Sequence, residues 1–464
     1  GYDQRDVDAA LARCGSGCNL LFLAARYDDV ALDVGAHPAG FAMYGYGMGV
    51  TTLRSPLFVR ARDWRPIVRV LASAPDRVHV ESLTLDGRKR EQRPPLRATG
   101  ELDAAALGRA VGLDLRVGVA DDRADAVVRQ VEIRDVIETG LASAHASGLT
   151  IEQSVVADIG CHRVDTPCGD RLPLFNPWDQ LPDYEVAPGV AVPGLANTGI
   201  GIVLLAGSRG AVIEDTIVAR VTKIGLEVFG GACGDPFESG DVHLSRNDVS
   251  DTAVGIVVNG GCRVRTRFNT VRRSGQSGSE SINLGTAFAC GNGSATSGPH
   301  DSEWVGNVAE DSQGGGFQVG CTHAARLVFR DNTSRRGCAT TRLAGSDFFA
   351  AGDPASPPAG LDVDGLTTVG SRCTFAVQVR ARSDVAIRGV DASAPVGIRL
   401  EDTARVDVRS SFFRSSASVN GTGVNFAYEG TAPMAAELVQ RSAGLSGFRA
   451  AVGYQVALSR THDI

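Results

Sequence analysis

The clearest pattern in the chain is a glycine followed by residues that alternate between apolar and polar, repeated many times after Val127. Alternation with a period of two is typical of β-strands. Several neighbouring copies start roughly 26 to 35 residues apart, which indicates stacked repeat units rather than βαβ crossovers. The copies begin at Gly140, Gly199, Gly225, Gly255, Ser281, Gly316, Gly397 and Gly423.

A second column of residues supports the same repeat. Asn247, Asn269, Asn307 and Asn332 each follow a strand pattern and precede a turn. Stacked asparagines can hydrogen-bond their amides from coil to coil, and asparagine is also a common turn residue in its own right. Both interpretations place a turn at the same point of each coil. The sequence therefore predicts an all-β fold, a single-stranded right-handed parallel β-helix (a solenoid).

The N-terminal residues predict a cap for this solenoid. Residues 3–13 form an amphipathic helical pattern, and the run 19–23 is typical of a buried strand. A short capping helix would cover the first coil, which otherwise exposes apolar core and unpaired strand edges. We therefore divide the chain into an N-terminal cap, residues 1–20, and a parallel β-helix domain, residues 21–464.

Two long loop insertions interrupt the predicted coils. Residues 92–125 contain Pro94, Pro95 and an alanine-rich stretch, and we interpret them as a loop excursion that carries a short helix. Residues 160–198 contain Trp178 and several prolines. Proline content argues against a packed domain there, and long loops are more often functional than incidental.

Composition and charge exclude some classes of function. The formal net charge of −7, from 46 basic and 53 acidic residues, gives no support to a nucleic-acid partner, which needs a basic face. No apolar run approaches the roughly 18 residues of a membrane span. The sequence opens at Gly1 without a signal peptide, as a mature or trimmed chain would.

Ten cysteines fall into neighbouring couples along the chain. No Cys-x-x-Cys motif or zinc-like Cys/His spacing occurs. Residues one coil apart are stacked in a parallel solenoid, so each couple could form a disulfide, and we expect a secreted or periplasmic protein. The couples are Cys14/Cys18, Cys161/Cys168, Cys233/Cys262, Cys290/Cys321 and Cys338/Cys373.

Two phrases near the N-terminus resemble the early coils of the pectin-lyase-like superfamily. These are Gly45-Tyr-Gly-Met-Gly-Val-Thr-Thr-Leu53 and Leu83-Thr-Leu-Asp-Gly87. The resemblance implies the right-handed parallel β-helix over residues 5–460 and a polysaccharide or oligosaccharide substrate along the outside of one sheet. The motifs of polygalacturonases, typical pectate lyases and mannuronan epimerases are missing, so it implies no particular activity. The glycine-rich phrase lacks the helix and acidic residue of a dinucleotide loop, and no organic cofactor is predicted.

The leading candidate site lies around Lys223, one of only two lysines in the chain. With Leu226 and Val228 facing inward, Glu227 faces outward, in the same outer column as Gly201 and Gln318. Several β-helical lyases pair a lysine with an arginine of the following coil, and Arg246 lies at roughly that place. The alternative interpretation is that Lys223 is a surface-turn residue in a lysine-poor chain.

Three further candidates lie near the second insertion. His145 falls at the end of an anchor strand one coil earlier, and His162 follows Cys161 with Asp165 three residues on. Each histidine is either solvated polar surface or an acid–base group. Glu227 with Asp165 or Asp248 could instead form the carboxylate pair of a glycosidase. Scattered carboxylates and amides could bind Ca²⁺, but no EF-hand or glycine–aspartate nonapeptide repeat occurs.

These features support three functions. The leading hypothesis is an exported carbohydrate-active enzyme, a polysaccharide lyase that cleaves an acidic glycan by β-elimination, with Lys223 as base and Arg246 and Glu227 assisting. The second is a glycoside hydrolase or transglycosylase that uses two carboxylates. The third is a non-catalytic glycan-binding surface solenoid. Epimerases and isomerases on the same scaffold complete the alternatives.

Overall fold

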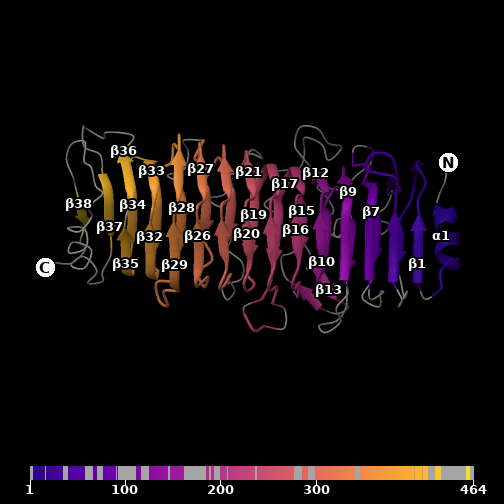
Figure 1. Cartoon of the computed structure of the whole chain (residues 1–464), viewed down its shortest axis with the longest axis horizontal. Helices are drawn as coiled ribbons and strands as arrows, with labels where there is room; N and C mark the ends of the chain where they lie inside the picture. Colours follow the sequence, from indigo (N-terminus) through magenta and orange to yellow (C-terminus); the bar gives the residue numbers. More distant parts are fainter. Residues whose placement is uncertain are drawn as a thin grey trace, which may run out of the picture. The chain divides into compact units, whose positions relative to one another are not determined.

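The structure is a computed structural model of the whole chain, and its elements are labelled in Figure 1. The chain divides into two compact units, residues 1–230 with 235–252 (unit 1) and residues 231–234 with 253–464 (unit 2). The residues that the structure describes are 4–15, 17–34, 40–57, 66–70, 77–89, 91, 111–116, 125–144, 147–160, 184–187, 190–192, 199–205, 207–231, 233–235, 238–275, 285–290, 298–339, 345–394, 396–401, 403–409, 411–415, 424–429 and 456–459.

Each coil of unit 1 contributes strands to three parallel sheets, which we name A, B and C in chain order. Sheet A contains β1 (Gly17–Leu21), β4 (Gly40–Tyr44), the first parts of β7 (Arg77–Asp86) and β9 (Asp125–Arg134), β11 (Thr150–Glu152), β16 (Val212–Glu214) and β18 (His243–Ser245). Sheet B contains β2 (Arg26–Tyr27), β5 (Thr52–Arg54), the second parts of β7 and β9, β12 (Val155–Ile159), the first part of β17 (Ile217–Phe229) and the start of β19 (Asp248–Asn259). Sheet C contains β3 (Leu32–Val34), β6 (Val68–Val70), β8 (Val111–Arg116), β10 (Thr139–Ala144), β15 (Ile200–Leu204) and the second part of β17.

Unit 2 repeats the same three sheets. Sheet A contains β20 (Arg265–Arg267), β23 (Glu303–Val305), β26 (Leu327–Arg330), β29 (Ala359–Asp364), β32 (Ser383–Arg388) and β35 (Ala404–Arg409). Sheet B contains β21 (Thr270–Arg272), β24 (Val308–Glu310), β27 (Thr333–Arg335), β30 (Thr367–Val369), β33 (Asp391–Ala394) and β36 (Phe412–Ser415). Sheet C contains the end of β19, β22 (Phe288–Cys290), β25 (Phe317–Val319), β28 (Ser346–Ala351), β31 (Phe375–Arg380), β34 (Val396–Glu401), β37 (Val424–Glu429) and β38 (Val456–Ser459).

This architecture confirms the predicted parallel β-helix. Every strand pairing within these sheets is parallel, and only the hairpin of β13 (Tyr184–Ala187) and β14 (Val190–Val192) is antiparallel among the described strands. The single described helix, α1 (Gln4–Arg13), agrees with the predicted N-terminal helix. It lies beside β1 in Figure 1, and the Gln4 side chain accepts a 2.6 Å hydrogen bond from the Ala31 backbone N–H. Among the described residues no helix is long and apolar enough to cross a membrane.

One predicted insertion needs correction. We expected residues 92–125 to leave the coils as a loop with a short helix, but Val111–Arg116 forms strand β8. β8 pairs with β6 on one side and β10 on the other, and Leu113 and Leu115 are fully buried. Alternation of apolar residues in this stretch was hidden by the alanine-rich sequence before it. Residues 92–110 and 117–124 lie outside the described part of the chain.

Four of the five predicted cysteine couples are disulfides in the structure. They join Cys14 to Cys18, Cys233 to Cys262, Cys290 to Cys321 and Cys338 to Cys373. The last three join neighbouring turns of the solenoid, as the one-coil spacing predicted. Cys161 and Cys168 lie outside the described residues.

The core of unit 2 contains a column of aromatic rings between its sheets. Phe288 and Phe317 of sheet C stack with their centroids 5.0 Å apart, and Trp304 and Phe329 of sheet A stack at 4.5 Å. Phe329 also meets Phe348 edge to face at 4.9 Å. In-register parallel pairing places equivalent residues of successive coils directly above one another, so their aromatic rings stack.

Many turns between strands place a residue other than glycine in the left-handed conformation. Asp158 and Arg220 (φ 59° and 54°) occupy this position on successive coils of unit 1, and two hydrogen bonds of 2.7 and 2.8 Å join their side chains. In unit 2, Arg273, Asp311 and Arg336 occupy the same turn in succession, and Arg336 binds Asp311 in the same bidentate way. The left-handed conformation costs about 1–2 kcal/mol per residue. An exposed ion pair contributes less than this to stability, so the Asp–Arg pairs offset only part of the cost.

The asparagine column at the A–B turn is a hydrogen-bonded ladder in unit 2. The Asn269 side-chain amide donates to the Asn307 oxygen at 3.1 Å, and the Asn307 amide donates to the Asn332 oxygen at 3.0 Å. The Asn307 amide also donates to the Thr266 carbonyl at 2.8 Å. All three asparagine side chains are buried. Buried polar groups are costly unless they are paired, so each rung depends on the next.

We expect Asn307→Ala to lower the free energy of unfolding by about 3 kcal/mol, because it leaves buried donors of Asn269 and the Thr266 carbonyl without this partner. Chemical denaturation measures the change. Thr333→Ala, at a half-buried position one coil further on, is the control and should change the free energy by less than about 0.5 kcal/mol. Equal effects of the two substitutions would contradict the ladder's role.

A buried carboxyl group gives unit 2 a pH-dependent stability. Asp347 has no exposed surface, and the Ser334 hydroxyl donates to its Oδ1 at 2.6 Å. Burial raises the pKa of Asp347 to about 6, while hydrogen bonds from Ser334 and Ser371 act in the opposite direction. The folded state therefore binds a proton that the unfolded state has already released between the ordinary pKa and about 6.

Because the pKa is raised on folding, the free energy of unfolding should fall as pH rises from about 4 to about 6 and then level off. Asp347→Asn removes this titrating group. The difference in free energy of unfolding between wild type and the variant should therefore depend on pH only between about 4 and about 6. Urea denaturation across the window tests this. Asp353→Asn, at a turn, should leave the wild-type pH dependence in place. A difference curve for Asp347→Asn that stays flat across the window would show that the carboxyl group titrates normally.

Candidate functional site

The ends of the second insertion meet at one point of the solenoid. Residues 160–199 separate β12 from β15, and their two terminal glycines lie side by side: an added Cβ on Gly160 would approach the Gly199 Cα to 2.7 Å. The same Cβ would approach the Thr222 hydroxyl of the next coil to 2.1 Å. Both glycines have positive φ, 88° and 87°, so the backbone and the close packing each favour glycine. The insertion therefore leaves and rejoins the coils against Thr222.

Lys223 follows directly at this junction. Its backbone N–H donates to the Gly199 carbonyl at 2.9 Å, and the Gly199 N–H donates to the Glu138 carbonyl at 2.6 Å. The same position of three successive coils is thus occupied by Glu138, Gly199 and Lys223. Because the middle residue is glycine, no side chain lies at this position between Glu138 and Lys223. Glu138 and Lys223 are 2% and 4% exposed. Both charged residues are therefore held inside the corner between sheets B and C.

Glu227 lies on the same strand as Lys223. Its side chain is 2% exposed, and its charge acts on Lys223. Burial lowers the pKa of Lys223 to about 8, and the nearby Glu227 carboxylate limits the shift by favouring the ammonium form. A lysine with such a pKa is partly neutral near physiological pH and can accept a proton.

The second lysine of the chain lies at the root of the same insertion. The Lys89 ammonium group donates to the carbonyl oxygens of Asp158 and Gly160, at 2.6 and 2.9 Å, and its side chain is 3% exposed. The sequence did not identify Lys89 as part of this site. The rarity of lysine, with only two in the chain, singles it out, but nothing in the sequence places residue 89 next to residue 160.

The outer column of Glu227 differs from our expectation. Glu227 pairs in register with Val203, and Val203 pairs with Ala142, so Gly201 is not its neighbour in the column. Asp114 continues the column and is 1% exposed, with Arg69 3.6 Å away. The prediction that Glu227 faces away from the core agrees with this register, because Asp33 in the same column is half exposed. Its near-complete burial was not predicted.

The structure does not bring Arg246 to Lys223. Arg246 is the left-handed residue of the A–B turn after β18, and its guanidinium binds Asp215 at 2.8 Å and Glu214 at 2.7 Å. Lys223 lies beyond sheet B, at the start of sheet C. Arg246 therefore lies at the A–B turn, where the asparagines stack, whereas Lys223 lies at the B–C turn. The expectation that Arg246 aligns with Lys223 assigned Arg246 to the wrong turn. The other expected partners, His145, His162 and Asp165, lie outside the described residues.

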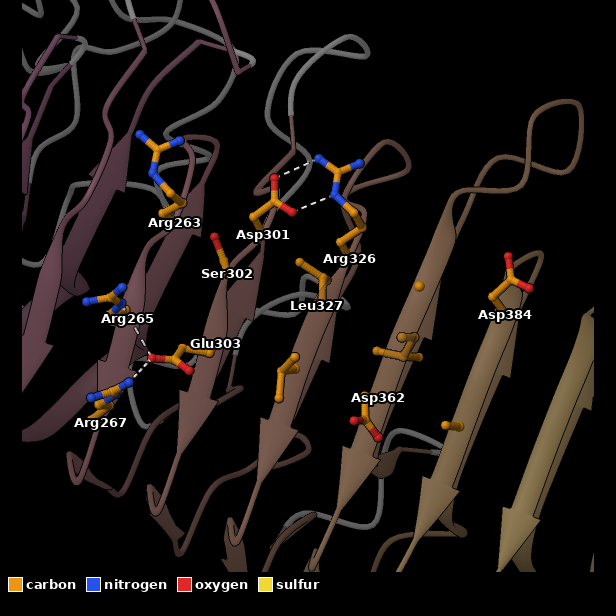
Figure 2. A pocket seen from close by; sticks show the side chains of 14 residues that line it. Arg263, Arg265, Arg267, Asp301, Ser302, Glu303, Arg326, Leu327, Asp362 and Asp384 are labelled. Carbon is orange, nitrogen blue, oxygen red and sulfur yellow. Dashed lines mark hydrogen bonds and ion pairs between the residues drawn. The ribbon is translucent and has the colours of Figure 1, made fainter.

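The glycosidase pair is not assembled from described residues. Asp248 begins β19 in sheet B, whereas Glu227 lies in the sheet C part of β17. Among the described residues no group of three or more His, Cys, Asp or Glu side chains could hold a metal ion. Two hollows are lined entirely by described residues, one on sheet A of unit 2 (Figure 2) and one beside α1, and Lys223 and Glu227 line neither of these.

Lys89 should be needed for the geometry of this junction. We expect Lys89→Met to lower the free energy of unfolding by about 2–3 kcal/mol, because two buried carbonyl groups lose a charged donor while the apolar stem is retained. Thermal and chemical unfolding measure the loss. Arg26→Met, at an exposed site of the same unit, is the control. Unchanged stability of Lys89→Met would mean that water replaces the ammonium group.

Comparisons with known proteins find similarity only among solved structures. No family model matches the chain, and no curated protein matches its sequence. Among solved structures it resembles the surface protein and adhesin PfbA of Streptococcus pneumoniae, at 10% identity and a TM-score of 0.45 over 92% of this chain and 94% of that one. It also resembles the mannuronan C-5 epimerase AlgE6 A-module of Azotobacter vinelandii, at 14% identity and a TM-score of 0.42 over 93% and 94% of the two chains.

A third similar structure is the catalytic unit of a GH87 α-1,3-glucanase from Streptomyces thermodiastaticus. The identity is 12% and the TM-score 0.44, and the match covers 93% of this chain but only 66% of the glucanase chain. These structural neighbours are right-handed β-helix proteins. One fold can carry many different activities, so the parallel β-helix alone assigns no activity.

Proposed function

We propose that the protein is a secreted or periplasmic polysaccharide lyase that cleaves an acidic glycan by β-elimination at Lys223. The observation that carries the proposal is the convergence of both ends of the long insertion on Thr222 and Lys223, with the Glu227 carboxylate buried on the same strand. Long insertions on a rigid scaffold are common positions for substrate-binding groups. The disulfides support an oxidising compartment.

The chemistry assigned to Lys223 is proton abstraction. The neutral Nζ takes the C5 proton of a uronic acid residue, the C5–H electron pair forms the C4–C5 double bond, and the C4–O bond breaks. The leaving oxygen is protonated by solvent. Glu227 orients Lys223 and sets how much of it is neutral at a given pH. Arg246 does not assist Lys223 in this reaction, because its guanidinium binds Asp215 and Glu214 on another turn.

Lys223→Met should reduce lyase activity by about 10² to 10⁴-fold, the usual contribution of a general base. Methionine keeps an unbranched apolar stem but leaves the buried Glu227 carboxylate without the Lys223 charge, so the melting temperature should fall, and activity is compared at a temperature at which the variant is folded. The readout is ultraviolet absorbance of the unsaturated product with a panel of uronic-acid polysaccharides. Full activity of Lys223→Met or Lys223→Ala would overturn the assignment, and reducing ends without absorbance would indicate hydrolysis.

The pH profile provides an independent check on the pair. Activity should rise with pH through about 8, as the Lys223 ammonium group loses its proton. Glu227→Gln removes the charge that raises the pKa of Lys223, so the rising limb should move to lower pH. Asp215→Asn, on the Arg246 turn, is the matched control and should leave the limb in place. A limb that Glu227→Gln does not move would contradict the coupling of the two groups.

A second candidate function is glycan binding without chemistry. The observation that favours it is that Lys223 and Glu227 are 4% and 2% exposed, which leaves little of either group for a reacting sugar. A binding protein would retain acidic polysaccharides in affinity electrophoresis and release neither unsaturated products nor reducing ends. The same substrate panel therefore separates the two functions.

A further inference from the structure

The first strand of sheet A has a free edge. β1 pairs in parallel with β4, and no described strand pairs with it on its other side. The Phe22 N–H donates to the Tyr44 carbonyl at the end of β4 at 2.8 Å, and alternate residues of a strand point their backbone groups to the same side. The N–H and C=O groups of Asn19 and Leu21 therefore point away from β4. From that side, no described residue forms a hydrogen bond with them.

This edge differs from the first edges of the other two sheets. Natural proteins protect an exposed sheet edge with short strands, charged side chains or proline. Sheet B begins with the two-residue strand β2, which carries Arg26, and sheet C begins with the three-residue strand β3, which carries Asp33. β1 has five residues, Gly17–Leu21, and none of them is charged or a proline. The sheet A edge thus lacks the protection that the other two edges have.

A groove runs along the free edge, because α1 lies beside β1 without closing against it (Figure 1). The groove has a volume of about 540 Å³. Val7 and Ala10 line it from α1, and Leu21 and Leu23 line it from the strand side. These two leucines are 62% and 48% exposed. Ligand sites in proteins have volumes of about 300–1,000 Å³, so the groove has room for a short extended segment.

The α1 wall of the groove carries a positive charge at one end. Arg13 lines the groove in the last turn of α1, next to Cys14, whose disulfide with Cys18 joins the helix to β1. Within the described part of the chain, Arg13 forms no ion pair with a carboxylate. Asp6 also lines the groove, about two helical turns away. An occupant that complements both walls is therefore uncharged along β1 and carries an acidic group at the Arg13 end.

We propose that β1 binds an extended peptide segment of a partner protein, which adds a strand to sheet A and places an acidic group on Arg13. Its backbone bonds to the free groups of Asn19 and Leu21, and its apolar or β-branched side chains contact the exposed leucines. A second copy of this chain does not fit, because its own β1 edge would bring its α1 against the α1 of the first copy. The site goes beyond the proposed function, since none of its residues takes part in the chemistry at Lys223.

Binding of synthetic peptides to the intact protein tests the site. The probe is a fluorescent, end-capped peptide of about six residues, the usual strand length, with alternating valine and threonine and one terminal glutamate. The glutamate is placed at either end, because an added strand runs parallel or antiparallel to β1. We expect at least one of the two peptides to bind in fluorescence anisotropy, and its lysine counterpart to bind about threefold or more weakly. No binding of either glutamate peptide at about 1 mM would overturn the proposal.

Methylated peptides distinguish strand addition from apolar contact alone. Only alternate backbone N–H groups of an added strand face β1. Methylation of one alternate set of peptide nitrogens should therefore weaken binding by about tenfold or more, whereas methylation of the other set should leave it nearly unchanged. Two methylated peptides of equal affinity would overturn the proposed strand addition.

The chain offers a matched pair of variants at one position. Leu21→Pro and Leu21→Ala both remove the leucine side chain, but only proline removes the N–H that points into the groove. This N–H takes no part in the pairing with β4, and proline is tolerated at such edge positions. Leu21→Pro should bind the peptide about tenfold more weakly than Leu21→Ala, and equal affinities would contradict the proposal. The methylated peptides provide the same test in wild type if Leu21→Pro does not fold.

The charge at the end of α1 has its own control. Arg13→Gln should lower the affinity for the glutamate peptide to that for an uncharged peptide of the same length. Arg5→Gln makes the same change in net charge on the same helix but outside the groove lining, and it should leave the affinity unchanged. Equal losses in the two variants would overturn the assignment of the acidic group to Arg13. A dimer in analytical ultracentrifugation that Leu21→Pro abolishes would overturn the partner peptide in favour of a second copy.

Discussion

Coil-to-coil backbone hydrogen bonding in strict register is the constraint on which the rest of the structure depends. Parallel pairing places each residue directly above its counterpart in the next coil, so every column repeats one environment. The stacked Phe288 and Phe317 rings, the Asn269–Asn307–Asn332 ladder and the cystines between neighbouring turns follow from it. A shift of one residue would turn each strand's apolar face outward and break all of these columns together.

The fold was predictable because its signals repeat. Glycine anchors, alternating apolar residues and the asparagine column each indicated the same coil, and errors at single positions did not matter. The missed strand β8 shows the limit, since one short strand between irregular segments has no repeat of its own to support it. Paired cysteines were informative for the same reason as the strands: their spacing is one coil.

The candidate site was less predictable, because it depends on the three-dimensional position of single residues. Lys223 and Glu227 lie four residues apart on one strand, so their proximity followed from local sequence. Assigning Arg246 required knowing which of three turns it occupies, and a spacing of one coil fits all of them. Lys89 reaches the carbonyls of Asp158 and Gly160 across two coils, a contact set by side-chain length and turn geometry. The burial of Glu227 also had no sequence signal, since a strand position that faces away from the core is ordinarily exposed to solvent.

The alternation of aspartate and arginine at the left-handed turns bears on how such a chain can change length in evolution. Arg273, Asp311 and Arg336 follow one another at the same turn of unit 2. Deleting the single coil that contains Asp311 would set two guanidinium groups against each other, whereas deleting two coils would restore opposite neighbours. Duplication or loss of coils in this region therefore keeps opposite charges next to each other at this turn only when it involves an even number of coils.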